Sequence, residues 1–197
     1  NILKFFLILN LIVSSAGYKH LYQTSWKLKK EENNIKIFLR KTFEEKQEYL
    51  AETIINKDMN SIYREIIDYN NSYKWMYKLE SSKILDKKND SLFYVQFTVE
   101  MSWPLKKRDL VSDVKITKNK DLITISLEST PDYIESSDNF IRIEDSKSKW
   151  VLSKIDNETT KVSLQSYAVI DGIPSFIVDM FIVEGPLFSL SNLKSKF

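Results

Sequence analysis

The sequence of 197 residues contains no cysteine, one histidine and three glycines. Without cysteine the chain has no disulfide, thiolate nucleophile or cysteine-ligated metal. The single histidine, His20, lies near the N-terminus, so no imidazole stands in the body of the chain for a catalytic triad or a multi-histidine metal site. The isolated glycines exclude G-x-G-x-x-G and P-loop phosphate sites. We therefore expect no metal and no cofactor.

The net charge of the chain is also small. Lys plus Arg number 29 and Asp plus Glu number 27, which gives a formal charge of +2. Such a balance does not favour nucleic acid as a partner. Because 43% of the residues are hydrophobic, a chain of this length can bury a core of its own. We expect one folded domain, a monomer, that does not bind nucleic acid.

The N-terminal segment has the pattern of a secretory signal peptide. Lys4 precedes a short apolar run from Phe5 to Val13, and Ser14-Ser15-Ala16 then supplies small residues at a cleavage site. We predict a signal peptide over residues 1–16, cleaved after Ala16, and a folded domain over residues 17–197. The protein is then exported, either to the periplasm or out of the cell.

Strand patterns fill the middle of the chain. Apolar residues alternate from Ile35 to Leu39 and an extended run follows at Tyr49–Ile55, which predicts a hairpin after a polar stretch. Asp58 can cap a helix with an apolar stripe from Met59 to Ile67. Further short apolar runs follow up to Ile170, separated by Asp, Asn, Lys and Ser clusters. Short links predict an antiparallel sheet.

Two segments show which faces meet. In the run Leu92–Met101, Phe97, Val99 and Met101 share one face, so one side of this strand is covered. After Ile173-Pro174 an amphipathic helix begins, and Gly185-Pro186 must interrupt or kink it because proline lacks an amide hydrogen. A sheet and a helix that are each apolar on one face must pack together, which predicts an α+β fold.

Several of these segments, taken in order, resemble the START (StAR-related lipid-transfer) domains. The resemblance rests on Trp103-Pro104, Arg108-Asp109, Pro131-Asp132-Tyr133, Ile141-Arg142, Trp150 and a closing helix that begins at Ile173-Pro174. It implies a helix-grip fold, in which a curved antiparallel sheet wraps around a long C-terminal helix and encloses a hydrophobic tunnel. It also implies one lipid-like ligand in that tunnel, carried without catalysis.

Candidate site residues follow from the resemblance and from strand and helix parity. The expected ligand-binding residues are Phe97, Val99, Met101, Arg108, Ser112, Tyr167, Phe176, Ile177 and Met180. The apolar members fit ordinary core packing equally well, because cavity walls and core look alike in a sequence. Arg108 either meets an anionic head group or forms a structural ion pair with Asp109 or another acid.

The segment between two predicted strands is a candidate gate. Trp103 and Pro104, with two lysines after them, either touch a bilayer transiently while the ligand is loaded or form a solvated hairpin turn. Two other functions stay open. One is a cyclase or aromatase of the helix-grip superfamily, for which Arg108, Tyr133 and Tyr167 are the candidate catalytic groups. The other is a groove that takes a partner protein's apolar segment.

Overall fold

The computed structural model describes residues 25–197, so the predicted signal peptide, its cleavage position and His20 lie outside the described residues. One sheet of ten strands dominates the part that is described. Its strands are β1 (Lys27–Glu32), β2 (Ile35–Lys41), β3 (Gln47–Ile55), β4 (Leu79–Asn89), β5 (Leu92–Val99), β6 (Arg108–Lys118), β7 (Leu122–Ser129), β8 (Ile141–Arg142), β9 (Ser146–Lys154) and β10 (Thr160–Ala168).

The strand order is β1-β2-β3-β10-β9-β7-β6-β5-β4, with the short β8 beside β6. The predicted hairpin is confirmed, since β2 and β3 pair with Lys36 opposite Glu52. Two features differ from the prediction. The pair β6–β8 is parallel, and the polar stretch before Ile35 holds the edge strand β1. Charged side chains on such an edge suit it because they discourage pairing with another chain.

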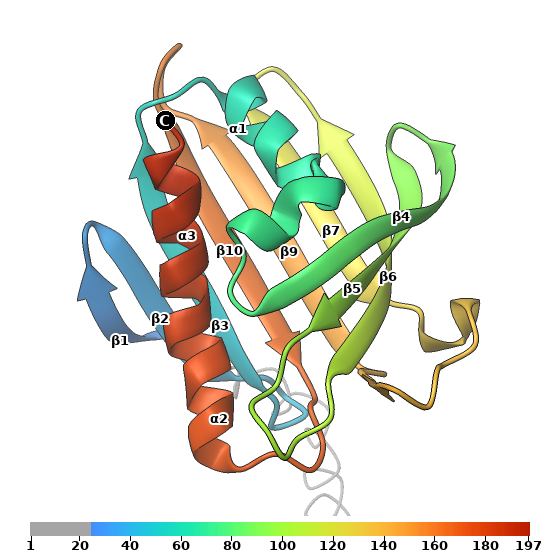
Figure 1. The fold of residues 1–197 in the computed structure, drawn as a ribbon. Helices are drawn as coiled ribbons and strands as arrows, with labels where there is room; N and C mark the ends of the chain where they lie inside the picture. Colours follow the sequence, from blue (N-terminus) through green and yellow to red (C-terminus); the bar gives the residue numbers. More distant parts are fainter. Residues whose placement is uncertain (1–24) are drawn as a thin grey trace, which may run out of the picture.

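Two helical segments connect β3 to β4. Asp58 caps α1 (Met59–Ile67) by accepting a 2.9 Å hydrogen bond from the amide of Ser61, as predicted. A 3₁₀ segment, η2 (Tyr69–Lys74), continues from it. A further 3₁₀ turn, η3 (Pro131–Tyr133), lies between β7 and β8. Figure 1 shows α1 and η2 lying over the same side of the sheet as the C-terminal helix.

The C-terminal helix has three consecutive parts, α2 (Ser175–Asp179), the π-helical η4 (Met180–Glu184) and α3 (Gly185–Ser195). Pro186 has no amide hydrogen, so the carbonyl of Ile182 cannot accept the usual α-helical bond from it. The Gly185 amide instead donates to the carbonyl of Met180, five residues earlier. The predicted interruption at Gly185-Pro186 is therefore a π-helical turn within a continuous helix.

The C-terminal helix crosses the concave face of the sheet, next to β2 and β3 (Figure 1). Leu190 and Leu193 in α3 are fully buried there. The stretch Phe176–Ser195 is long and apolar enough to cross a membrane, but burial of its inner face is also what a core helix of a globular domain shows. This arrangement confirms the predicted α+β helix-grip fold: an antiparallel sheet around a C-terminal helix.

Candidate functional site

An interior cavity of about 240 Å³ lies between the concave face of the sheet and the C-terminal helix. Residues of seven strands form one wall, and Val178, Phe181 and Ile182 of the helix form the other. Among residues 25–197, no charged side chain lines this cavity. Most of its surface is aliphatic or aromatic, as in pockets for apolar small molecules. The cavity therefore suits an uncharged, largely apolar ligand.

Hydroxyl groups are grouped on one part of the cavity wall. Strand pairing sets Ser148 of β9 opposite Ser166 of β10, and Ser166 opposite Tyr49 of β3. The two serine hydroxyls are 2.6 Å apart and hydrogen bonded. Burial raises the pKa of the Tyr49 hydroxyl to about 12, while its hydrogen bond to Ser166 acts in the opposite direction. Ser112 adds a fourth hydroxyl to the same wall. We call these four residues the hydroxyl belt.

Two other polar groups of the lining have no hydrogen-bond partner. They are the hydroxyl of Tyr69 and the indole N–H of Trp75, on residues that are 4% and 1% exposed. The Tyr69 ring packs edge to face on Phe93 and Phe97, with centroids 5.7 and 5.8 Å away. The Trp75 ring packs in the same way on Trp150 at 6.1 Å. Aromatic packing thus fixes both rings while their donors remain unpaired.

A second, external groove of about 340 Å³ lies between α2 and the loop of residues 100–107, which we call the Trp103 loop. Trp103 is 93% exposed and Phe176 is 65% exposed, although both are large apolar side chains. Phe181 borders this groove and the interior cavity alike. Its ring is therefore the shared wall between the two spaces.

Phe181 is held by an aromatic cluster at the π-helical turn. Its ring is edge to face with Tyr77 at 5.8 Å, and Tyr77 packs in the same way on Phe188 at 5.6 Å. Gly185 permits this approach, since a Cβ there would lie 3.3 Å from Cδ1 of Tyr77. The amide of Tyr77 also donates to the hydroxyl of Ser189 in α3. The helix and the residues before β4 thus meet at this wall.

Arg108 lies at the start of β6 and is 2% exposed. Its guanidinium donates to the carbonyl oxygens of Lys106 and of Asp171, the latter at 3.2 Å, while its Nε has no partner. Burial lowers the pKa of Arg108 from its usual value. Arg108 therefore links the Trp103 loop to the segment that leads into α2, and it does not line the cavity.

The suggested ion pair between Arg108 and Asp109 is wrong. Consecutive residues of a strand point to opposite faces, so the two side chains cannot meet across β6. Asp109 instead pairs with Arg142 of β8, whose Nε and Nη2 lie 2.8 and 2.7 Å from the two carboxylate oxygens. Gln96 donates to the same carboxylate at 3.1 Å. This buried cluster lies on the other face of β6 from Ser112 and holds the segment before β8 against the sheet.

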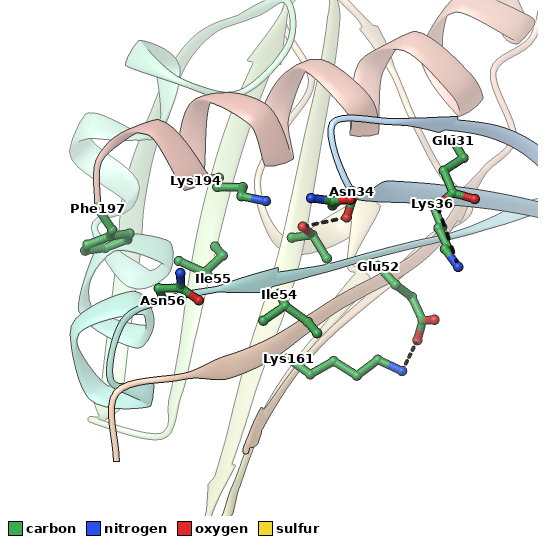
Figure 2. Close-up of a pocket in the computed structure, with 11 residues that line it drawn as sticks. Glu31, Asn34, Lys36, Glu52, Ile54, Ile55, Asn56, Lys161, Lys194 and Phe197 are labelled. Carbon is green, nitrogen blue, oxygen red and sulfur yellow. Dashed lines mark hydrogen bonds and ion pairs between the residues drawn. The ribbon is translucent and has the colours of Figure 1, made fainter. Parts of the chain in front are cut away.

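A larger hollow, of about 710 Å³, lies at the edge of the sheet near the C-terminus (Figure 2). Its charged groups have partners within the chain. Lys161 pairs with Glu52 at 2.8 Å, Lys36 with Glu31 at 3.7 Å, and Lys194 donates to the carbonyl of Asn33. Because these groups satisfy one another, the hollow is a weaker candidate than the interior cavity. Residues 25–197 contain no group of His, Cys, Asp or Glu side chains arranged for a metal ion.

Comparison with known proteins identifies the fold. No family model matches the chain. An uncharacterized protein of Pseudomonas aeruginosa is 30% identical over 86% of this chain and 85% of its own. The crystal structure of a STAR-related lipid transfer protein from Xanthomonas axonopodis superposes with a TM-score of 0.79 and 28% identity, covering 88% of this chain and 98% of that one. The chain has the fold of a START domain.

More distant solved structures share the fold alone. Human StAR-related lipid transfer protein 5 superposes with a TM-score of 0.76 at 17% identity, over 93% of this chain and 87% of that one. The Zhui aromatase/cyclase of a Streptomyces species superposes with a TM-score of 0.57 at 10% identity, over 76% of this chain and 92% of that one. A START-type sheet and helix therefore occur in proteins with different activities.

Within this START domain the predicted ligand-binding residues fall into three places. Phe97, Val99, Ser112 and Tyr167 line the interior cavity. The external groove, by contrast, is bordered by Met101, Phe176, Ile177, Met180 and both proposed gate residues, Trp103 and Pro104. Met101 is displaced because β5 ends at Val99, so strand parity no longer applies to it. Arg108 borders neither space.

Sequence reasoning missed the residues that close the cavity. The helical side chains that face it are Val178, Phe181 and Ile182, whereas Phe176, Ile177 and Met180 face the Trp103 loop. Apolar residues on one face of a helix recur every three or four positions. Counting back in this way from the buried Leu193 and Leu190 passes Pro186 and reaches Ile182 and Val178, which are two of the three helical residues that face the cavity. For Tyr69 and Trp75, the sequence carries no signal that their donors are unpaired.

Proposed function

We propose that this START domain binds one hydrophobic, lipid-like ligand in the interior cavity and carries it without chemical change. The observation that supports this most strongly is the cavity itself, which lies between the sheet and the C-terminal helix and is lined without charge. The superposition on a lipid transfer protein at 28% identity supports the same function. Removing an apolar ligand from water supplies the driving force, at about 25 cal/mol per Å² buried.

Loading of the ligand needs a wider space than the structure offers. A cavity of about 240 Å³ is larger than the roughly 150 Å³ that holds benzene, but smaller than the roughly 300–1,000 Å³ of drug-sized ligand pockets. Phe181 lies between the cavity and the external groove, so rotation of this side chain or a shift of η4 would join the two spaces. We infer that the ligand passes at this wall.

Native mass spectrometry of the full chain tests the proposal. The intact mass is compared before and after denaturation, in a protein purified from cells that contain lipids. A stoichiometric extra mass that is lost on unfolding is the expected result, and the same spectrum reports whether the protein is the predicted monomer. An unloaded protein, together with no binding of added lipids, would overturn carriage.

A matched pair of variants ties the bound mass to the cavity. Leu110→Trp places a larger side chain into the lining, whereas Leu122→Trp makes the same change on the exposed rim of β7. Bound ligand should fall strongly in the first variant and stay unchanged in the second. Thermal unfolding of both confirms that each is folded.

Export stays part of the proposal, because it rests on residues 1–16. An exported carrier would move or hold its ligand beyond the cytoplasm, where a free apolar molecule is poorly soluble. N-terminal sequencing of the protein recovered from the cell fractions of a bacterial host tests this. Cleavage after Ala16 in an exported fraction is expected, and an intact N-terminus in the cytoplasm would contradict export.

The runner-up function is a cyclase, favoured by the Zhui-like fold and by the hydroxyl belt within the cavity. Of its candidate groups, Tyr167 lines the cavity, Arg108 does not, and Tyr133 stacks on Tyr94 and donates to Asp86. Tyr167 borders the cavity, but its side chain points to the other face of β10 from Ser166, where its hydroxyl bonds to Asp145 and its ring lies 4.8 Å from the ammonium of Lys46. Turnover of a polyketide-like substrate that is lost in Tyr167→Phe would support this function over carriage.

A further inference from the structure

We propose that the cavity binds its ligand in one orientation, with a carbonyl oxygen of a ketone, ester or amide between Ser146 and Ser148 and with the apolar chain directed toward Trp150. The proposal rests on the function above and specifies the chemical class and the direction of the ligand. Ser146 and Ser148 lie on the inward face of β9 and line the cavity. We call them the β9 serines.

A count of hydrogens in the hydroxyl belt gives the first donor. Tyr49, Ser166 and Ser148 form a chain of three hydroxyls joined by two hydrogen bonds. Three hydroxyls carry three hydrogens, so one hydrogen of the chain has no acceptor within residues 25–197. A phenol is more acidic than an aliphatic hydroxyl, so Tyr49 donates to Ser166 and Ser166 donates to Ser148. The free hydrogen is therefore on Ser148, which is only partly buried.

Ser146 supplies the second donor. Its amide donates to the hydroxyl of Ser129 at 3.1 Å, whereas its own hydroxyl has no partner within the described chain. Ser146 is 5% exposed, and its side of β9 borders the cavity. The unpaired donors of Tyr69 and Trp75 differ, because those atoms have almost no accessible surface and cannot meet a ligand. The donors that a ligand can reach on β9 are therefore those of the β9 serines.

The β9 serines can reach one common oxygen. Residues two apart on a strand share a face and lie about 6.7 Å apart along it. Ser146 has no bond that fixes its side chain, so it can turn toward Ser148 and place both hydroxyls about 2.8 Å from one oxygen between them. Ser112 lies on β6, two strands from β9, and at about 9.5 Å it is too far away to share that oxygen.

Two unpaired hydrogens favour a carbonyl oxygen as their acceptor. A carbonyl oxygen has two lone pairs and no hydrogen, so it accepts from both serines and leaves neither donor unpaired. A ligand hydroxyl also accepts, but it adds a hydrogen that needs an acceptor of its own. Because no charged side chain of residues 25–197 lines the cavity, a carboxylate would lose its hydration without gaining a counter-charge.

The order of residues along the strands gives the direction of the ligand. On the inward face of β9, Trp150 follows the β9 serines. On β10, Ser166 lies opposite Ser148 and Leu164 lies opposite Trp150. The ring of Trp75 packs on Trp150 from the side of the helical segments. The cavity wall is thus polar at one end and apolar further along, and a ligand chain buries most apolar surface when it lies along Trp150 and Leu164.

Three probes with the same seven-carbon chain separate this proposal from the function on which it rests. Heptane, 2-heptanone and 2-heptanol are titrated into the full chain, and tryptophan fluorescence reports binding because Trp75 and Trp150 line the cavity. Ser146→Ala should weaken 2-heptanone binding by roughly threefold to tenfold, the range for one net hydrogen bond, and leave heptane binding unchanged. The preference for 2-heptanone over 2-heptanol should shrink when Ser148→Ala is added.

Ser153→Ala is the matched control, since Ser153 lies on the same strand but on its opposite face and does not line the cavity. It should leave the affinities for all three probes unchanged. Thermal unfolding of each variant shows that the domain is folded.

The infrared carbonyl stretch of 2-heptanone follows the hydrogen bonds without any variant. The ketone is labelled with ¹³C at its carbonyl so that its band is separated from those of the protein. Hydrogen bonds to a carbonyl oxygen lower its stretching frequency. The bound ketone should therefore absorb at a lower frequency than the same ketone dissolved in heptane.

A brominated ketone tests the direction of the chain. In 7-bromo-2-heptanone the bromine, a short-range quencher of tryptophan, is at the far end of the chain from the carbonyl. Stronger quenching than with 2-heptanone is expected, and unchanged fluorescence would overturn the direction. A bound carbonyl frequency equal to that in heptane, or equal losses of heptane and 2-heptanone affinity in Ser146→Ala, would overturn the carbonyl site while the apolar cavity stands. If neither heptane nor 2-heptanone binds, the proposed carrier function itself fails.

Discussion

Arg142 and Asp109 form a buried, two-pronged ion pair across the parallel contact of β8 with β6, with N–O distances of 2.8 and 2.7 Å. The two side chains are 7% and 1% exposed. Arg142 also donates to the carbonyls of Pro131 and Ile134, so one guanidinium holds together the segment between β7 and β8. A strand of two residues has little pairing of its own, and this ion pair secures it.

Breaking that pair should strongly destabilise the domain. Asp109→Asn leaves the Arg142 charge buried without its partner, which costs about 3–5 kcal/mol of unfolding free energy. The control is Glu80→Gln, which breaks the half-exposed pair of Glu80 with Lys107 and should cost less than about 1 kcal/mol. Urea denaturation measures both variants, and equal losses would show that burial does not set the value of the Asp109 pair.

Phe181→Ala should open the wall between the cavity and the external groove. Loss of a half-buried aromatic ring costs about 1–3 kcal/mol of stability, and ligand release should become about tenfold faster or more. Phe188→Ala is the control, because Phe188 packs on the same Tyr77 ring but borders neither space. Stopped-flow release of a fluorescent lipid measures both, and equal release rates would place the passage elsewhere.

Alkaline pH should weaken the fold through Tyr49. Its pKa is about 12 in the folded protein because burial disfavours the phenolate, against about 10 in the unfolded chain. A pKa raised by folding gives stability that is complete below pH 10 and lost as the pH rises toward 12. Between about pH 9 and pH 11.5 this group alone should cost about 2 kcal/mol.

The variant Tyr49→Phe isolates that contribution. Urea unfolding at the two pH values should show a smaller alkaline loss in Tyr49→Phe than in the unchanged protein. Burial also raises the pKa of Tyr69, so some alkaline loss should persist in the variant. A loss of the same size in both proteins would mean that Tyr49 ionises as easily in the fold as outside it.

Membrane contact should depend on the rim of the external groove. Trp103 and Phe176 are exposed apolar side chains beside Lys106 and Lys107, a combination that suits the interface of a bilayer. The double variant Trp103→Ser with Phe176→Ser should reduce co-sedimentation with phosphatidylcholine/phosphatidylglycerol vesicles by roughly tenfold. Phe43→Ser alters another exposed apolar side chain, away from this groove, and should have no effect. Unchanged sedimentation of the double variant would rule out this rim.

Local patterns in the sequence located most of the strands and helices, and the resemblance to START domains supplied the way in which they pack. Alternation gave the hairpin β2–β3, Asp58 marked the start of α1, and Pro174 marked the start of the last helix. Each signal lies within about ten residues of the element that it specifies. The edge strand β1 was not predicted. A strand is recognised by alternating apolar and polar residues, and the residues of β1 are nearly all charged.

The candidate site was harder because it depends on contacts between distant segments. Strand parity found Phe97, Val99 and Ser112, but it also carried Met101 past the end of β5. Asp109 finds its partner 33 residues away, through a parallel pairing that no local pattern encodes. Whether a donor such as that of Tyr69 is paired depends on every surrounding side chain, so it becomes visible only in three dimensions.

The π-helical turn at Met180–Glu184 is equivalent to one extra residue in an otherwise regular helix. One residue corresponds to about 100° of rotation, so the faces of α2 and α3 are set independently of each other. Deleting a single residue from this turn would leave Leu190 and Leu193 unable to stay in the core while Phe176 stays at the rim. The sequences of α3, which anchors the helix in the core, and of α2, which borders the groove, can thus change separately. The number of residues in the turn between them cannot change without rotating one face relative to the other.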